Sequence, residues 1–225
     1  MSQSRSTISI LALLLATTAS GQEVLKPIDP NDGWKLASQK NGITIYARVR
    51  AGSPIKEFKA VGEIDAPTPV VYAVIADFEN YPRFMPYTTE CRLLKREGDA
   101  TIGYQRLSPK IVADRDYALR VRSKSWPSGD GTAYLNWWTA ANEHAPPEKP
   151  GVVRVKVCDG GWLLEPNGAN KTRATYSVYT DTGGLIPPFV ANHASQIGIP
   201  RLFEAVRTQA RNPKYKTAAA RIDNQ

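Results

Sequence analysis

The chain has 225 residues, of which 42% are hydrophobic and 22% are charged, and its formal net charge is +8 at pH 7. This length fits one domain or at most two, and the apolar content suffices for a full core. The composition excludes a low-complexity chain and a membrane-embedded one.

The N-terminal segment has the features of a secretory signal peptide. Arg5 precedes an apolar run over residues 8–16, and small residues follow it. This order predicts cleavage near residues 19–21. The run of about nine residues is far shorter than the roughly 20 that span a bilayer as a helix. An uncleaved anchor or a disordered tail is the alternative. We therefore expect residues 1–21 to be removed and the protein to be periplasmic or secreted.

The basic residues are spread along predicted strands. Arg120, Arg122 and Lys124 occupy alternate positions, and no dense basic run or nucleic-acid motif is present. The pattern fits a solvated outer sheet face, or a surface for anionic membranes. We expect no nucleic-acid partner, transient contact with an anionic membrane surface, and a monomer.

Two cysteines, Cys91 and Cys158, are too few for a disulfide framework. They fall on predicted strands far apart in sequence. One bridge and two free thiols are both compatible with export. The cysteines and the two histidines show no metal-ligand spacing, so we expect no metal and no cofactor.

The first half of the chain predicts a short helix, a hairpin and a second helix. Residues 34–39 suggest a short helix that packs Trp34. Apolar and polar residues alternate over 43–50 and 58–64, which is typical of half-buried strands. A helix start at Thr68, followed by apolar residues at helical spacing, predicts a helix to about residue 80.

A long series of strands follows. Alternating segments separated by turn residues are found at 90–95, 102–107, 116–123, 133–139, 152–157, 162–165 and 172–179. Hairpin, helix, antiparallel strands and a terminal helix in this order define an α+β arrangement.

The C-terminal helix begins at Pro187-Pro188, after the glycine pair Gly183-Gly184. Proline suits a first helical turn because its missing N–H has no partner there. Apolar residues recur at helical spacing at Val190, Ala194, Ile197, Leu202, Phe203 and Val206. Pro200 should kink this helix or break it in two.

Three motifs carry a resemblance to a known family. Asp114-Arg115-Asp116-Tyr117 resembles the Arg-Asp-aromatic signature of START lipid-transfer domains. The run from Gly161 to Pro166 is similar to their penultimate strand, and the run from Asp181 to Asn192 to the start of their C-terminal helix. The connector 77–84 resembles that of the wider Bet v 1-like superfamily.

The resemblance implies a division of the chain and a helix-grip fold. It covers residues 34–211 as one START domain, after a signal peptide (1–21) and an N-terminal linker (22–33). Residues 212–225 would form a flexible basic tail. The expected fold is a curved antiparallel β-sheet wrapped around a long C-terminal α-helix, with a hydrophobic tunnel between them.

Members of this family mostly bind and carry lipids. By this resemblance the chain would hold one sterol, phospholipid, fatty acyl or similar lipid, and carry or sense it in the cell envelope. Burying apolar lipid surface is favourable by about 25 cal/mol per Å².

The signature strand supplies the first candidate ligand contacts. Alternation places Arg115, Tyr117 and Leu119 on one face. Arg115 either binds an anionic or hydroxyl group of the ligand, or forms an ion pair with Asp114, Asp116 or Asp181. Cholesterol-binding relatives have a second arginine further along this face, where this chain has Val121, so a sterol-specific assignment is weakened.

Further candidates lie on other elements. Tyr104 and Arg106 share one strand face, which is either ligand-lining or surface. Trp137 and Trp138 point to opposite faces, and we take Trp137 as the wall residue. The terminal helix would roof the tunnel with Phe189, Val190, His193 and Ile197. The loop 108–113, with Lys110, Ile111 and Val112, would gate it or pack as an ordinary loop.

We expect a non-enzymatic protein. A polyketide cyclase, aromatase or hydrolase on the same fold would need an acid–base pair inside the cavity. His193 with Tyr104, or Arg115 with a carboxylate, are the candidates for such a pair. A ligand-responsive interaction module is a third possibility.

Overall fold

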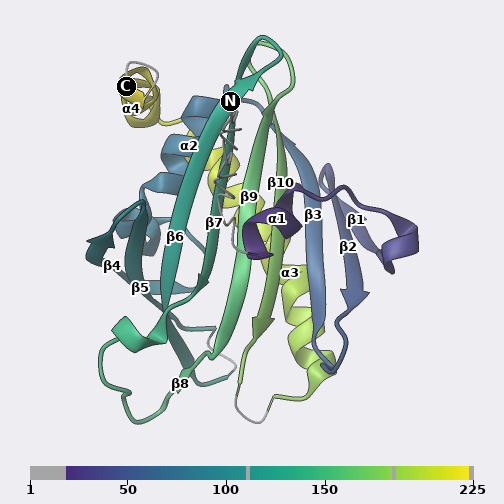
Figure 1. Cartoon of the computed structure of the whole chain (residues 1–225), viewed down its shortest axis with the longest axis vertical. Coiled ribbons are helices and arrows are strands. Elements are labelled where there is room, and N and C mark those ends of the chain that lie inside the picture. The colour runs from purple at the N-terminus through teal and green to yellow at the C-terminus, as the bar shows by residue number, and fades with distance from the viewer. Residues whose placement is uncertain (1–18, 110–111, 184–185, 223–225) are drawn as a thin grey trace, which may run out of the picture.

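The structure is a computed structural model that describes residues 19–109, 112–183 and 186–222 (Figure 1). Its strands form one sheet in the order β1-β2-β3-β10-β9-β7-β6-β5-β4, in which each neighbouring pair is antiparallel. The short strand β8 pairs in parallel with the start of β6. The expected curved antiparallel sheet with a long C-terminal helix is therefore confirmed.

The strands are β1 (Lys35–Lys40), β2 (Ile43–Val49), β3 (Lys56–Ile64), β4 (Thr88–Glu97), β5 (Ala100–Leu107), β6 (Asp114–Ser128), β7 (Gly131–Ala140), β8 (Val152–Arg154), β9 (Val157–Pro166) and β10 (Thr172–Asp181). The α-helices are α1 (Ala19–Leu25), α2 (Thr68–Ala76), α3 (Pro188–Ala210) and α4 (Pro213–Ile222), and 3-10 turns lie at Pro30–Asp32, Phe78–Arg83 and Asn142–His144. The outermost strands β1 and β4 both have register shifts against their neighbours.

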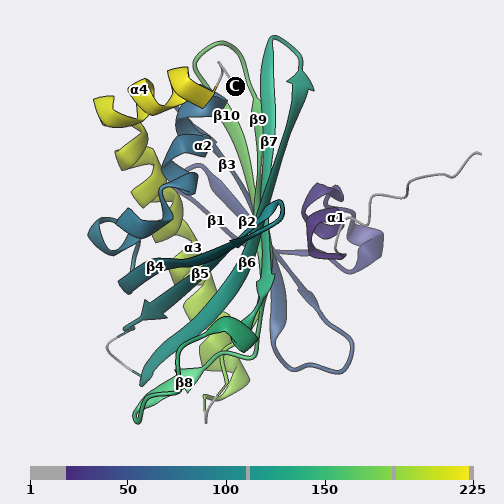
Figure 2. The ribbon, with the colours of Figure 1, turned by 60° about the vertical axis from the view of Figure 1, so that its left-hand side comes forward.

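Helices cover both faces of the sheet. Figure 2 shows α1 on one side and α2, α3 and α4 on the other. We call the side of α2 and α3 the concave face and the side of α1 the convex face. The main core lies on the concave face, where the ring of Phe203 from α3 packs on Trp162 with ring centroids 5.0 Å apart. A Cβ on Gly62 would come within 3.0 Å of the same phenylalanine ring, so glycine lets α3 approach β3.

Residues 34–39 form a strand and not the expected helix. The turn at Asn41-Gly42 has positive φ at both residues (54° and 68°), the geometry of a two-residue hairpin. That hairpin folds Lys35–Lys40 back onto β2. Trp34 is buried on the convex side, with the Arg48 guanidinium 4.6 Å from its ring centroid.

A packed helix, α1, spans the end of the expected signal peptide and the start of the expected N-terminal linker. Val24 is 1% exposed and contacts Trp137 and Leu163 on the convex face. The side chain of Lys59, which is fully buried, reaches up from β3 to this helix. Its ammonium group donates to the backbone oxygens of Glu23 (2.9 Å) and Lys26 (2.7 Å). Burial lowers the pKa of Lys59, because the charged form loses water there.

Replacing Lys59 with methionine should release α1 from the sheet. Methionine fills similar space but cannot donate, so the two carbonyl groups lose a charged donor. We expect a loss of about 1.5–3 kcal/mol in the free energy of unfolding and faster amide exchange in residues 21–26. Lys56→Met, at an exposed position of the same strand, is the matched control. Equal effects of the two substitutions would show that Lys59 does not hold α1.

The expected flexible tail is also helical in the structure. Helix α4 begins at Pro213 and packs on α2, with Tyr215 2% exposed. Asp77 anchors it by accepting hydrogen bonds from Lys214 Nζ (2.6 Å) and the Tyr215 hydroxyl (3.0 Å). The tail was predicted to be flexible because its apolar residues at helical spacing, Tyr215 and Ala219, lie between basic residues in the sequence. Pro200 does not break α3, which runs through it as one helix.

Candidate functional site

The concave wall of β5 and β6 carries three of the predicted ligand contacts. Strand pairing sets Arg115 opposite Leu107, Tyr117 opposite Gln105 and Leu119 opposite Gly103. Val121, further along β6, pairs with Trp138 of β7. Strand β7 in turn pairs with β9, which carries the core residue Trp162, and Trp138 packs against that core. Because side chains alternate between faces, all of these residues point to the concave side.

An apolar cluster separate from the main core occupies this wall. Its buried members are Tyr117, Leu119, Val155 and Cys158, with Leu107, Val121 and Trp138 packed against them. No residue of α3 belongs to this cluster. Burial raises the pKa of the Cys158 thiol to about 11, and Cys91 is likewise a free thiol.

Arg115 is buried on this wall without an acidic partner. Its side chain is 5% exposed, and Nη1 donates to the backbone oxygen of Ala113. Its Nε is buried and has no hydrogen-bond partner among the residues that the structure describes. The aspartates predicted as ion-pair partners are engaged elsewhere among the described residues: Asp114 pairs with Arg106 at 2.7 Å and Asp116 with Arg154 at 2.7 Å.

Arg115 therefore does not form the structural ion pair that the sequence left open. The third aspartate, Asp181, is exposed and accepts from the Gly183 amide. Burial lowers the pKa of Arg115, although the nearby Asp114 charge opposes that shift. A buried guanidinium with a free Nε can bind an oxyanion or another acceptor.

Polar groups beside Arg115 form a small network. The Tyr117 hydroxyl donates to Gln105 Oε1 (3.2 Å), and Gln105 Nε2 donates to Thr88 Oγ1 (3.1 Å). Burial raises the pKa of Tyr117 well above its ordinary value, so its hydroxyl stays protonated. The sequence analysis did not identify Gln105 as a site residue. The signal for it is the inward direction of Tyr117, because Gln105 lies directly opposite Tyr117 on β5 and points the same way.

The N-terminal half of α3 lies on the same side of the sheet as this wall but adds no residue to its apolar cluster. Val190, Ile197 and Arg201 recur at helical spacing and so share one side of the helix. The Arg201 guanidinium reaches the hydroxyl of Tyr87, which directly precedes β4, so that side points toward the β4 edge. Ile197 is 43% exposed.

The other predicted roof residues are also open to solvent. Phe189 is 74% exposed, and His193 is exposed as well. Asn192 fixes this end of the helix to the β2–β3 turn, because its side chain accepts from the Lys56 amide (2.9 Å). The apolar sheet wall and this exposed apolar side of α3 thus both lie on the concave side of the sheet. Part of the predicted gate, Lys110 and Ile111, lies outside the described residues.

Tyr104 and Arg106 are not ligand-lining, because they lie on the convex side of β5. Tyr104 is 1% exposed and its hydroxyl donates to Asp116 Oδ2 at 3.0 Å. Arg106 is paired with Asp114. The register that points Gln105 inward necessarily turns both neighbours outward.

The choice between the two adjacent tryptophans was also wrong. Trp137 is on the convex face under α1, whereas Trp138 is on the concave face. The Trp138 indole lies against the Cys158 thiol, and its Nε1 makes no hydrogen bond of ordinary geometry. Tyr176 of β10 lies beside it, with ring centroids 6.0 Å apart.

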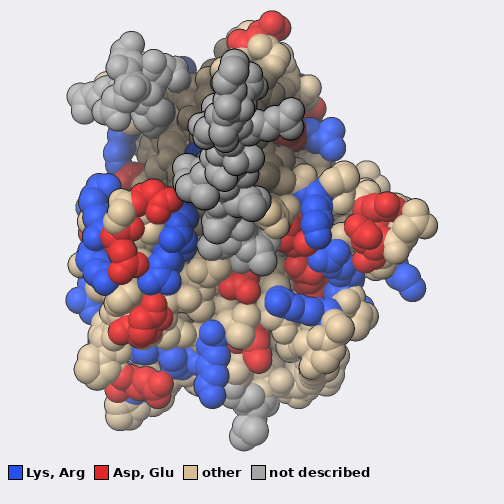
Figure 3. Space-filling model, viewed as in Figure 1, with Lys and Arg blue, Asp and Glu red and all other residues tan. Residues whose placement is uncertain are grey.

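Three basic residues of β6, namely Arg120, Arg122 and Lys124, lie on the convex face as expected, and the two arginines are paired. Arg120 contacts Glu97 (2.9 Å) and Glu143 (3.1 Å), and Arg122 contacts Asp99 (3.2 Å). Figure 3 shows blue and red side chains interleaved over this part of the surface. The charges are therefore largely balanced on the convex face.

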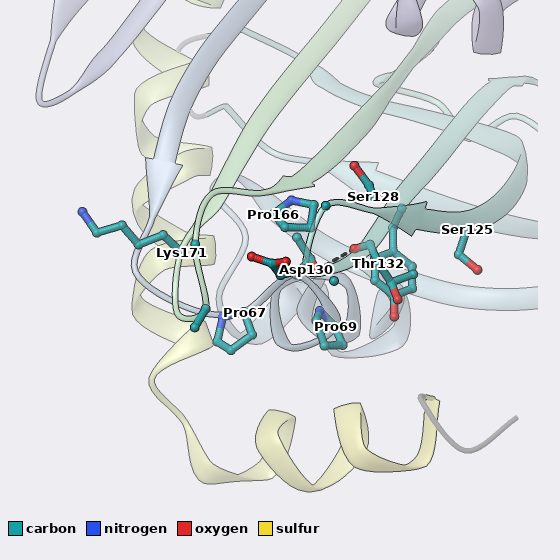
Figure 4. Close-up of a pocket in the computed structure, with 14 residues that line it drawn as sticks. Pro67, Pro69, Ser125, Ser128, Asp130, Thr132, Pro166 and Lys171 are labelled. Atoms are coloured by element: carbon teal, nitrogen blue, oxygen red, sulfur yellow. Dashed lines mark hydrogen bonds between the residues drawn. The ribbon is translucent and has the colours of Figure 1, made fainter.

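A separate hollow of about 670 Å³ lies at the opposite end of the sheet (Figure 4). The start of α2 and the β6–β7 and β9–β10 turns line it, including Thr68, Asp130 and Lys171. The Thr68 hydroxyl donates to the Thr132 carbonyl at its wall (2.7 Å) and does not cap α2. None of the predicted site residues lies there.

Within the described ranges, no three His, Cys, Asp or Glu side chains gather closely enough to hold a metal ion. No helix of residues 19–109, 112–183 and 186–222 is long and apolar enough to cross a membrane.

A curved antiparallel sheet that grips a long C-terminal helix, with an apolar wall between them, defines the helix-grip class. The chain belongs to the family described as polyketide cyclase / dehydrase and lipid transport, whose model matches residues 64–207. The START resemblance seen in the motifs is thereby confirmed.

The chain is also similar to the following proteins. An uncharacterized protein of Pseudomonas aeruginosa, PA1579, is 31% identical over 72% of this chain and 78% of its own length. The phosphatidylcholine transfer protein of Rattus norvegicus is 25% identical over 87% and 92% of the two chains. A solved STAR-related lipid transfer protein from Xanthomonas axonopodis is 29% identical and superposes with a TM-score of 0.70, covering 80% of this chain and all of that one.

Proposed function

We propose that this protein binds one lipid between the concave sheet wall and the N-terminal half of α3, and carries it within the cell envelope. The observation that carries the proposal is the separate apolar cluster around Tyr117 and Leu119, to which α3 adds no side chain. An apolar wall opposite an exposed apolar helix side is the arrangement expected of a lipid site. The lipid-transfer relatives support it.

Localisation in the envelope rests on the N-terminal sequence. A basic residue, a short apolar run and small residues suit a cleaved export signal. The contacts that hold this segment on the sheet, made by Glu23, Val24 and Lys26, all lie after the expected cleavage site near residue 21. A transient encounter with an anionic membrane would let the lipid enter and leave.

The proposed role is non-enzymatic. The acid–base pair considered from the sequence cannot form, since Tyr104 is on the convex face and His193 is on the exposed part of α3. Arg115 has no carboxylate within ion-pair distance among the described side chains, so the second candidate pair is not assembled either.

Lipid extraction from vesicles tests this function. Purified protein, incubated with vesicles of mixed phospholipids and re-isolated, should carry lipid at up to one molecule per chain by mass spectrometry. Protein that extracts nothing, and that co-purifies with nothing from its host, would contradict the proposal.

A pair of substitutions at exposed apolar residues sharpens the test. Ile197→Glu places a charge on the α3 side that faces the wall, and should lower lipid transfer about tenfold with little change in stability. Leu36→Glu is the matched control, because Leu36 is 62% exposed on the outermost strand β1. Equal transfer by both variants would place the lipid elsewhere.

A further inference from the structure

Arg115 has no charged neighbour at any other inward position of the surrounding strands. The concave positions of β5, β6, β7, β9 and β10 are filled by apolar, hydroxyl, amide and thiol side chains, with Arg115 as the one exception. A buried cation with no carboxylate in ion-pair contact is costly unless something compensates its charge.

Arg115 marks one end of the apolar wall, so the wall has a charged end and an apolar end. It lies at the beginning of β6, beside β8 and the loop after β5. Tyr117, Leu119 and Val121 follow inward on the same face, and Trp138 lies opposite Val121. Val121 is six residue steps along the strand from Arg115, which is roughly 20 Å. This is a length that a long acyl chain can cover.

We propose that the bound lipid is an anionic amphiphile, with its oxyanion on Arg115 and its chain along Tyr117, Leu119 and Val121 toward Trp138. This inference rests on the proposed lipid-binding function and names the chemistry of the headgroup. A carboxylate and a phosphate both offer the oxygen acceptors that a guanidinium binds.

The wall also argues against a cationic headgroup. A cationic headgroup beside Arg115 would need a carboxylate nearby to offset the two like charges. No inward position of the five strands carries a carboxylate, and the nearest acids, Asp114 and Asp116, point to the convex side with their own arginine partners. An added positive group next to Arg115 would meet uncompensated like charge.

Four single-chain probes separate the possibilities: palmitate, hexadecyl phosphate, hexadecanol and hexadecylphosphocholine. Each is titrated into delipidated protein by calorimetry. We expect at least one of the two anions to bind about 10- to 100-fold more tightly than hexadecanol. Hexadecylphosphocholine should bind more weakly than hexadecyl phosphate. Comparison of palmitate with hexadecyl phosphate shows whether a carboxylate or a phosphate is the source of the oxyanion.

Arg115→Gln should remove that preference, so that the anions bind about as well as hexadecanol does. Arg122→Gln is the matched control, because it makes the same change on the same strand but on the convex face. Binding of all four probes with equal affinity, unchanged in Arg115→Gln, would overturn the anion proposal and leave lipid binding intact. Binding of none would contradict the function itself.

The proposal stays testable if Arg115→Gln does not fold. The preference of the unmodified protein for an anion over hexadecanol is then decisive, since it needs no variant. An affinity ratio near one would overturn the proposal. Arg115→Lys keeps the charge without the planar fork, and its anion affinity should fall between those of the unmodified protein and hexadecanol binding.

Discussion

Replacing Asp116 with asparagine should lower the free energy of unfolding by about 3 kcal/mol. Asp116 is 2% exposed on the convex face. It accepts from Arg154 Nε (2.7 Å) and Nη2 (3.0 Å) and from the Tyr104 hydroxyl (3.0 Å). Asparagine keeps the shape but leaves the Arg154 charge uncompensated at a position of low exposure. Urea unfolding at pH 7 measures the loss.

The matched control is Asp99→Asn. Asp99 also pairs with an arginine, Arg122 at 3.2 Å, but its side chain is 76% exposed. Water screens such a pair, so the expected loss is below about 1 kcal/mol. Similar losses in the two variants would show that the Asp116 network contributes no more than a surface pair.

The Asp116 variant also predicts a pH dependence. Burial alone would raise the pKa of Asp116, but hydrogen bonds from Arg154 and Tyr104 hold it below its ordinary value. Its stabilising contribution is therefore complete above the unfolded pKa of about 3.9 and is lost as pH falls toward the folded pKa. The stability difference between the unmodified protein and Asp116→Asn should narrow at pH 3.

Replacing Gly160 with alanine should cost about 3 kcal/mol or more and should also weaken lipid binding. A Cβ at this position would lie 2.8 Å from Cζ2 of Trp138 and would also clash with the backbone oxygen of Ser177. The indole of Trp138 rests on the bare backbone of Gly160. A methyl group there must displace the inner end of the proposed lipid wall.

Gly198→Ala is the matched control for this substitution. A Cβ at Gly198 meets no atom within 4 Å, and the residue lies within α3. Alanine is favoured over glycine in a helix by about 0.8–1 kcal/mol, so this variant should be slightly more stable. Thermal unfolding of both variants checks the prediction, and a harmless Gly160→Ala would contradict the close contact.

Most strands could be predicted from alternation, because one buried face leaves a period of two in the sequence. The prediction of a helix at residues 34–39 was wrong because this short segment does not itself indicate that it will pair with β2. Helix α4 was missed for a related reason. Its few apolar residues predict a packed helix only when the partner surface is known, and that surface is formed by Asp77 and α2.

The site was predictable only as far as each strand could be oriented by itself. In β6 the charged residues Arg120 and Arg122 marked the outer face, so Arg115 and Tyr117 were placed correctly. Tyr104 has no such marker, since both faces of β5 carry polar residues. The direction of Tyr104 is set by the pairing of β5 with β6. That pairing depends on a second strand and cannot be derived from the sequence of β5 alone.

The irregular pairing of the two outermost strands has a consequence for solubility. An open sheet exposes unpaired backbone groups along both margins, and flat margins invite aggregation with a second molecule. In β1 the register shifts between Leu36 and Ser38, and in β4 it shifts twice. Exposed charges at Arg96 and Glu97 add repulsion and hydration along β4. These distortions make each margin a poor template for pairing with a strand of another molecule.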